Sequence, residues 1–507
     1  MDPTSPNDST DLLRALQQLT ERIVSEPSDA ATTSALVLLL QDLGTSLLDV
    51  GQRTQIGANP TFSECVSQLW AIEGSRTKVE ELRVELVRAL TRLTRNVTAG
   101  SPDNQLWVAK RCEPSLRKLL HFLTSFYNSQ VIEYHGLTTL LAQCLANTIT
   151  GNEITSTMIW TEYMDLVEQD NILTRLLAYP EQKSVTATLV FALNSSTSSP
   201  QLIPVIAERV GGRATYIALL EIADRTYEDE DRADQFQLIF QIFVKLFEHG
   251  GLSPLYTSLQ PSDGTISPHQ ITLLKLLDGY TQSADYTVNT APLINDFLTR
   301  TLLSLLRTSN TWMNADLVNG QPNENLPQAA TAIVLVSQML SNGLMAEQIA
   351  WEKLIDNGPR GRPILENLSS AESSYVELII DVLRQLDQLL PRIQFGKVRP
   401  QFPNTSSPNE LVSPDVSGFQ FVKRDLIRLL GTVVHDDKSI QDRIRERGGI
   451  QVVLSLCAVD DRNPYIREHA LFTLRNLLHN NKENQDVVRE LEPMGRWDEN
   501  GVLTNYH

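Results

Sequence analysis

The feature that most constrains this chain is an internal copy near its C-terminal end. The segment His435–Asp442 returns as His479–Asp486 at an offset of 44 residues, and the same offset pairs Arg445 with Arg489. A period of roughly 40–47 residues with helical patterning is typical of armadillo and HEAT repeats. Because such repeats stack into an extended surface rather than around one enclosed pocket, the copy favours a binding scaffold over an enzyme.

The copied segment predicts three helices. Lys438–Arg447 predicts a short helix that ends at a glycine pair, where glycine can adopt the left-handed conformation of a helix end. Ile450–Ala458 predicts a second helix, and Tyr465–His479 predicts a third, which follows a proline-containing turn. One short and two longer helices make an armadillo repeat. The offset places His435-Asp436-Asp437 before the short helix, so we interpret this triplet as a turn rather than as a metal-binding pair.

Helical spacing of apolar residues continues through the rest of the chain, without a convincing run of alternating strands. We therefore predict an all-α, armadillo-like α-solenoid, with a first helix at Asp11–Val24 and a long helix at Lys78–Val97. Prolines among Asn, Ser and Thr interrupt this pattern near residue 400 and stop helix formation there. The expected domains are a disordered N-terminus (1–10), a helical array whose repeats are hard to follow after about residue 200 (11–396), a linker or loop (397–418) and a C-terminal armadillo-like domain (419–507).

A pattern of asparagines connects the two ends of the chain. Asn476 is followed eight residues later by Asn484-Gln485, and Asn96 is followed eight residues later by Asn104-Gln105. The pattern is weaker at Asn147 and Asn194, which also lie late in predicted helices. The candidate partner-binding residues of this group are Asn96, Asn147, Asn194 and Asn476.

Two interpretations of these asparagines stay open. Late in the third helix of an armadillo repeat, asparagine faces the groove, and in nuclear-import receptors it clamps an extended peptide, because an amide both donates and accepts hydrogen bonds. Alternatively, the asparagines bridge neighbouring repeats, since stacking alone can require such bonds. The import receptors also place tryptophan one turn earlier, so recognition of basic localisation signals is disfavoured here. The corresponding residues of this chain are Arg92, Gln143, Val190 and Phe472.

A second candidate site is a charged face near the C-terminal end. Arg467, Glu468 and Arg475 lie on one predicted helix, and Glu468 and Arg475 are seven positions apart, which places them on one helix face. A partner could bind this face. Solvation and surface ion pairs explain the same charges without a partner, because charge-rich helix faces are common.

Composition limits the other classes of function. The net charge of −18 disfavours binding to nucleic acid and to anionic membranes. No apolar run approaches membrane-spanning length, and the N-terminus does not resemble a secretory signal. The four cysteines are dispersed without a CxxC pair, which predicts free thiols in a reducing compartment. We expect a cytoplasmic protein with protein partners and without catalytic residues, cofactor or metal, and homo-oligomer formation stays open.

Three segments near the C-terminal end resemble the C-terminal domain of the ataxin-10 family, namely Phe421–Gly431, Asp460–Ala470 and Arg475–Leu478. The resemblance is dense from Phe419 to Leu491, and the chain resembles a fungal-type member. It implies an armadillo-like cytoplasmic protein without known catalytic activity that is linked to regulation of cytokinesis. The name of fungal relatives leaves copper homeostasis as one alternative, and an enzyme with a site hidden in 200–400 is another.

Overall fold

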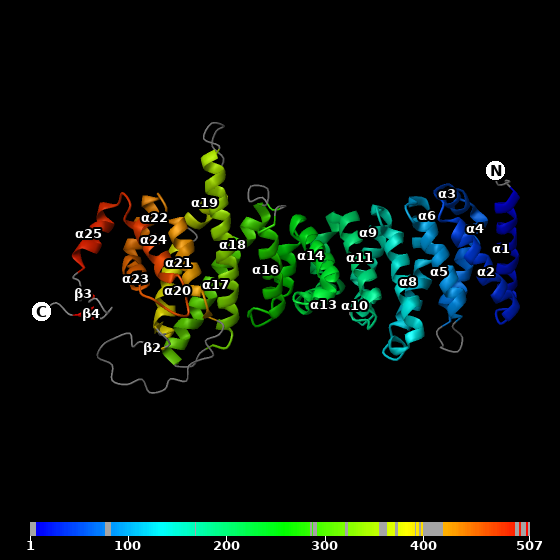
Figure 1. The fold of residues 1–507 in the computed structure, drawn as a ribbon, viewed down its shortest axis with the longest axis horizontal. Helices are drawn as coiled ribbons and strands as arrows, with labels where there is room; N and C mark the ends of the chain where they lie inside the picture. The colour runs from blue at the N-terminus through cyan, green and yellow to red at the C-terminus, as the bar shows by residue number, and fades with distance from the viewer. Residues whose placement is uncertain are drawn as a thin grey trace. The chain divides into compact units, whose positions relative to one another are not determined.

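Helices make up nearly all of the described structure, a computed structural model (Figure 1). By their contacts the residues divide into two compact units, which we call the first unit (Met1–Leu259) and the second unit (Gln260–His507). The described residues are 7–76, 83–167, 169–283, 286, 292–319, 323–353, 362–370, 374–390, 392–394, 397–398, 419–491, 496–497 and 503–504.

The first unit is a stack of three-helix repeats. Its helices are α1 (Asn7–Ser25), α2 (Ala30–Ser46), α3 (Val50–Gly57), α4 (Pro60–Gly74), α5 (Val84–Thr98), α6 (Pro102–Arg111), α7 (Glu113–Leu123), α8 (Ile132–Ile149), α9 (Glu153–Asp165), α10 (Ile172–Leu177), α11 (Gln182–Ser198), α12 (Ile203–Glu208), α13 (Val210–Thr226), α14 (Ala233–Glu248) and α15 (Leu252–Ser258). One row of helices runs in the order α2, α5, α8, α11 and α14, and each contacts the next. Two other helices separate each member of this row from the next, so each row member is the third helix of a repeat. This organisation confirms the predicted all-α, armadillo-like class.

The third helix α5 illustrates why these residues fold in this way. Leu86, Leu90, Leu93 and Val97 recur at spacings of three and four, and each is at most 1% exposed. Burial of each such side chain contributes about 1.5–3 kcal/mol, and α5 contacts both α2 and α8. The predicted long helix is thus present from Val84, whereas 78–82 lie outside the described residues.

One turn conformation recurs between the third helix of a repeat and the first helix of the next. Gly100, Gly151, Asp436 and Asn480 have φ values of 66°, 68°, 56° and 52°. Each directly precedes the N-cap residue of the following helix. Glycine adopts this left-handed conformation easily, and Asn and Asp adopt it more readily than other residues do. The repeat boundary therefore carries a local sequence signature.

The second unit follows the same plan. Its helices are α16 (Pro268–Thr281), α17 (Pro292–Asn319), α18 (Leu326–Lys353), α19 (Pro363–Ser369), α20 (Tyr375–Leu389), α21 (Val422–Val433), α22 (Lys438–Glu446), α23 (Gly449–Ser455), α24 (Ile466–Leu478) and α25 (Lys482–Glu490). The third helices are α18, α21 and α24, which contact one another in that order. The three helices predicted from the internal copy are present as α22, α23 and α24, but α23, with seven residues, is shorter than the nine-residue α22 rather than longer.

The segment 397–418 lies inside a repeat. The helix that follows it, α21, contacts both α18 and α20, which precede it, and all three belong to the second unit. The contacts therefore place the boundary between compact units at 259/260 instead of at the proline-rich segment. The segment interrupts the repeat α19–α21 between its second and third helices. Residues 399–418 themselves lie outside the described residues.

Two smaller expectations change. Residues 7–10, expected in a disordered N-terminus, already belong to α1. The described residues also include two antiparallel pairs of two-residue strands, β1 (Ile393–Gln394) with β2 (Lys397–Val398) and β3 (Arg496–Trp497) with β4 (Leu503–Thr504). These pairs are local and leave the all-α class unchanged.

One helix among the described residues could cross a membrane by length and composition alone. It is α18, in which an 18-residue window within Leu326–Glu352 has a mean hydropathy of 1.4. The prediction that no apolar run approaches membrane-spanning length is therefore wrong for this helix. Of that window, 61% is buried within the protein, and a buried core helix passes the same test.

Candidate partner-binding groove

The four candidate asparagines all lie late in third helices. In three of them the side-chain Nδ2 donates to a backbone carbonyl of the preceding third helix. Asn96 donates to Gly44 at 2.8 Å, and Asn147 donates to Arg95 at 3.1 Å. Asn476 donates to Gly431 at 2.9 Å. These carbonyls belong to the last turns of α2, α5 and α21, where carbonyls lack intrahelical backbone donors. The asparagines therefore join neighbouring repeats by capping carbonyls at helix ends.

Asn194 differs from the other three. Its Nδ2 donates to the side-chain hydroxyl of Thr150 at 2.8 Å, in an exposed setting. It still reaches the end of the preceding third helix, α8. Because both partners are accessible to water, this bond contributes less to stability than a buried one.

The asparagines that follow Asn96 and Asn476 by eight residues have the same structural role at both ends of the chain. Asn104 donates to the carbonyl of Val97 at 3.0 Å, and Asn484 donates to the carbonyl of Leu477 at 2.8 Å. Both are buried and cap the third helix that has just ended. The spacing that links the two ends in sequence is therefore a structural equivalence.

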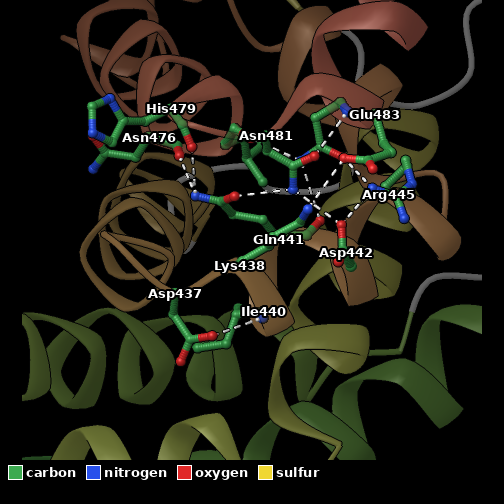
Figure 2. Close-up of polar contacts among 12 residues, drawn as sticks. Asp437, Lys438, Ile440, Gln441, Asp442, Arg445, Asn476, His479, Asn481 and Glu483 are labelled. Atoms are coloured by element: carbon green, nitrogen blue, oxygen red, sulfur yellow. Dashed lines mark hydrogen bonds and ion pairs between the residues drawn. The ribbon is translucent and has the colours of Figure 1, made fainter.

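A glutamine that the sequence interpretation did not single out holds the repeat boundary together (Figure 2). Gln441 Nε2 donates to the carbonyls of Asn476 at 2.9 Å and His479 at 3.3 Å, at the end of α24. Its Oε1 accepts from Asn481 Nδ2 at 3.0 Å. Asn481 also donates to Asp442, and this bond, followed by Arg445, lowers the pKa of the Asp442 carboxyl.

The first unit contains the same arrangement. Gln105 Nε2 donates to the carbonyls of Asn147 at 2.8 Å and Thr150 at 3.0 Å, and its Oε1 accepts from Asn152 Nδ2 at 3.0 Å. The sequence contained a signal for Gln441, because the 44-residue offset pairs it with Gln485, the glutamine of the Asn484-Gln485 pattern. The pattern is thus first of all a helix-capping system.

The triplet His435-Asp436-Asp437 is confirmed as a turn. Asp437 is the N-cap residue of α22 and accepts from the backbone N–H of Ile440 at 3.1 Å (Figure 2). Across the described ranges, no group of three or more His, Cys, Asp and Glu side chains is arranged to hold a metal ion. Burial raises the pKa of Cys112 to about 12 and also raises the pKa of the other three cysteine thiols.

A hollow of about 350 Å³ opens between the third helices α8 and α11. Asn147 lies in its wall, at the position predicted for a groove asparagine. The hollow is lined by Thr139, Gln143, Ala146, Asn147, Lys183, Thr186, Ala187 and Val190. Asn147 uses its Nδ2 in the repeat junction, whereas its Oδ1 accepts no hydrogen bond from the residues that the structure describes. Asn147 therefore both joins two repeats and lines the hollow. We call the surface along the third helices α5, α8 and α11, which includes this hollow, the groove.

A second hollow of about 620 Å³ lies along α7, with residues that follow α9 on its other side. Its Arg117 already pairs with Glu113 at 3.1 Å and with Glu162 at 2.5 Å. Its His121 lies 3.6 Å from Asp170. The guanidinium of Arg117 is therefore occupied within the protein, and burial lowers the pKa of His121, so this hollow is a weaker candidate than the one between α8 and α11.

The predicted charged face is exposed on α24. Arg467, Glu468 and Arg475 are all exposed, and none forms a hydrogen bond or ion pair within the described part of the chain. Leu471 and Phe472 are also partly exposed on this helix, at 47% and 41%. The charges therefore lie on a mixed surface in contact with solvent, and binding of a partner there stays a prediction.

A buried ion cluster ties α21 to the helix before the proline-rich segment. Lys423 is 1% exposed, and its Nζ lies 3.2 Å from Asp387 Oδ1 and 3.8 Å from Asp460 Oδ2. Burial lowers the pKa of the Lys423 ammonium despite these carboxylates. Burial alone would raise the pKa of Asp387, but hydrogen bonding to Arg392 and the charge of Lys423 hold it below its ordinary value. Spacing offered no signal for this cluster, because its members come together only in three dimensions.

Comparison with known proteins identifies the C-terminal segment. The sequence model of the spinocerebellar ataxia type 10 protein domain matches residues 422–506. The ataxin-10 homolog of Dictyostelium discoideum is 40% identical over 87 residues, which are 17% of this chain and 14% of that protein. Ataxin-10 of Bos taurus is 37% identical over 87 residues, which are 17% of this chain and 18% of that protein. The aligned part thus spans less than a fifth of these relatives. A crystal structure of SYS-1 is similar with a TM-score of 0.34 and 14% identity, over 92% of this chain and 85% of that one.

Proposed function

From the match of residues 422–506 to the spinocerebellar ataxia type 10 protein domain, we propose that the chain is a non-enzymatic scaffold for protein partners. The partners bind in the groove between third helices, in the cytoplasm, and the chain takes part in the regulation of cytokinesis. The cytokinesis role comes from the family resemblance. Binding at the charged face of α24 and homo-oligomer formation remain further options within this proposal.

The observation that supports the binding role is the hollow between α8 and α11. It combines apolar walls at Ala146, Ala187 and Val190 with polar groups at Gln143 and Asn147. Apolar walls with a few placed polar groups are typical of binding sites. Because the walls belong to stacked helices, the surface is formed before any partner arrives.

The groove is tested by filling it. Val190→Trp places an indole in the hollow, and Val205→Trp places the same side chain on α12, where Val205 is 48% exposed and does not line the hollow. Each variant is fused to a biotin ligase for proximity labelling in dividing cells, and circular dichroism verifies its helical content. We expect the unsubstituted chain and Val205→Trp to label division-septum or contractile-ring proteins, and Val190→Trp to lose them.

The two parts of the proposal fail separately. If the unsubstituted chain labels no division-septum or contractile-ring component, the cytokinesis role is wrong. If Val190→Trp labels the same proteins as Val205→Trp, the groove is not the binding surface. The copper alternative predicts stoichiometric copper in the purified protein, and we expect metal analysis to find none.

A further inference from the structure

The groove that contains the hollow carries a stripe of positive charge. On α5, Arg88, Arg92 and Arg95 follow one another at spacings of four and three, and all three are at least partly exposed on one helix face. Arg95 Nη1 donates to Gln143 Oε1 at 2.8 Å, which places this guanidinium beside the hollow. Lys183, on α11, lines the opposite wall. Cations therefore flank the hollow on both sides.

Most of these cations lack a carboxylate partner. Arg88 pairs with Glu85 at 2.7 Å. Arg95 bonds to neutral amide oxygens, and neither Arg92 nor Lys183 has an ion-pair partner among the residues that the structure describes. No carboxylate lines the hollow. The middle of the groove is therefore positive, although the whole chain carries a net charge of −18.

The nearby carboxylates lie at the N-terminal ends of the third helices. Glu181 is the N-cap residue of α11 and lies 4.0 Å from His135 Nδ1. Glu133 lies in the first turn of α8. More distant acidic residues act weakly, because charges separated by more than about 8–10 Å are largely screened at physiological salt. Glu181 Oε1 also accepts from the backbone N–H of Lys183 at 3.3 Å, so this carboxylate offsets part of the Lys183 charge. The guanidiniums of Arg92 and Arg95 therefore supply the stronger positive side of the groove.

We infer that the groove takes an extended acidic peptide that carries an apolar side chain between its carboxylates. The apolar residue enters the hollow against Ala146, Ala187 and Val190. A backbone N–H of the peptide donates to Asn147 Oδ1, and its carboxylates pair with Arg92 or Arg95 on one side and with Lys183 on the other. This inference rests on the proposed binding role and specifies the class of its partner.

The geometry also sets the spacing of the acidic residues. Packed helices lie about 8–10 Å apart, so the step from α5 across α8 to α11 covers about 16–20 Å. An extended chain advances about 3.3 Å per residue. Lys183 also lies seven residues, about 10 Å, before Val190, which is level with Arg92, so the diagonal separation is about 19–23 Å. Two carboxylates about six to seven residues apart, with the apolar residue between them, therefore match the cations. Nucleic acid shares the charge but fits less well, because no aromatic side chain lines the hollow for base stacking.

The test uses a fluorescein-labelled synthetic peptide with a central leucine, a glutamate about three residues away on each side, and glycine and serine elsewhere. Fluorescence anisotropy compares the unsubstituted full chain with Lys183→Glu and with Lys275→Glu. Lys275 is exposed on α16 and does not line the hollow, so its substitution makes the same change in net charge without altering the lining. We expect saturable binding that weakens with salt, and a loss of about tenfold in Lys183→Glu, since attraction becomes repulsion. Lys275→Glu should bind like the unsubstituted chain.

Four results would overturn the inference. The first is no saturable binding up to about 1 mM peptide, and the second is equal binding of a peptide with lysine in place of glutamate. The third is an equal loss of binding in Lys183→Glu and Lys275→Glu. The fourth is displacement of the peptide by a single-stranded oligothymidine at matched charge. None of these results decides the broader proposal. Loss of division proteins in Val190→Trp, together with failure of the acidic peptide, would show a groove that binds partners of another chemistry.

Discussion

Replacing Asn476 with alanine should destabilise the junction between α21 and α24 by about 2 kcal/mol. The Asn476 side chain is 5% exposed, and its amide donates to the carbonyl of Gly431 at 2.9 Å. A buried carbonyl that loses its partner costs about 1–3 kcal/mol. Water cannot easily replace the amide, because the helices cross closely here. A Cβ on Gly431 would lie 2.4 Å from Thr473 Oγ1 and 3.0 Å from Phe472 Cδ1.

A matched substitution is available in Asn194. Its amide bonds to a threonine hydroxyl in an exposed setting, so water can satisfy both groups when the side chain is removed. We expect Asn194→Ala to cost about 0.5 kcal/mol or less. Asn476→Asp retains the shape of the side chain without its donor, and it should be at least as destabilising as alanine, because the carboxylate faces a carbonyl.

Hydrogen exchange measured by mass spectrometry reports the local stability of each junction separately. A local measurement is needed because the chain has two compact units. If local opening controls exchange, about 2 kcal/mol corresponds to roughly 30-fold faster exchange in the peptides that cover 422–434 and 466–479. Asn194→Ala should change exchange around 182–198 by less than about threefold. If Asn476→Ala accelerates hydrogen exchange at its own junction no more than Asn194→Ala does at its junction, the capping role assigned to the buried asparagines is wrong.

Two further predictions concern the second unit. Lys423→Met should destabilise it by about 3 kcal/mol, because removal of one partner leaves buried carboxylates poorly compensated; an unchanged urea midpoint would contradict this. Glu377 accepts hydrogen bonds from Arg443 with both carboxylate oxygens at 2.8 Å. Burial by itself would raise the pKa of the Glu377 carboxyl, but the pairing with Arg443 outweighs burial and holds this pKa below its usual value. A lowered folded pKa adds stability above the unfolded value of about 4.3, and this stability is lost as the pH falls through the folded value. Glu377→Gln should therefore have a lower urea midpoint near neutral pH and a smaller loss on acidification, and equal pH dependence of both proteins would refute the role of this pair.

Much of the repeat architecture could be read from the sequence because its determinants are local. The apolar spacing of α22 to α24 predicts their positions within a few residues. The turn residues Gly100, Gly151, Asp436 and Asn480 are types that accept positive φ, and the asparagine pattern lies where helix ends need donors. After about residue 200 the repeat continues, but α17 and α18 each have 28 residues, and helices of this length disturb the period.

The sequence by itself determined the helical class, the repeat type and which asparagines share a position, since periodicity and helix capping act over a few residues. Only the tertiary structure decided where each asparagine amide points, because its partner lies in the neighbouring repeat. Tertiary contacts also showed that α21 packs on α18 and α20 despite the proline-rich segment between them. They brought Lys423 to Asp387 and Asp460, and they placed cations from α5 and α11 around one hollow. These features depend on contacts between residues that are distant in sequence, and no local pattern encodes them.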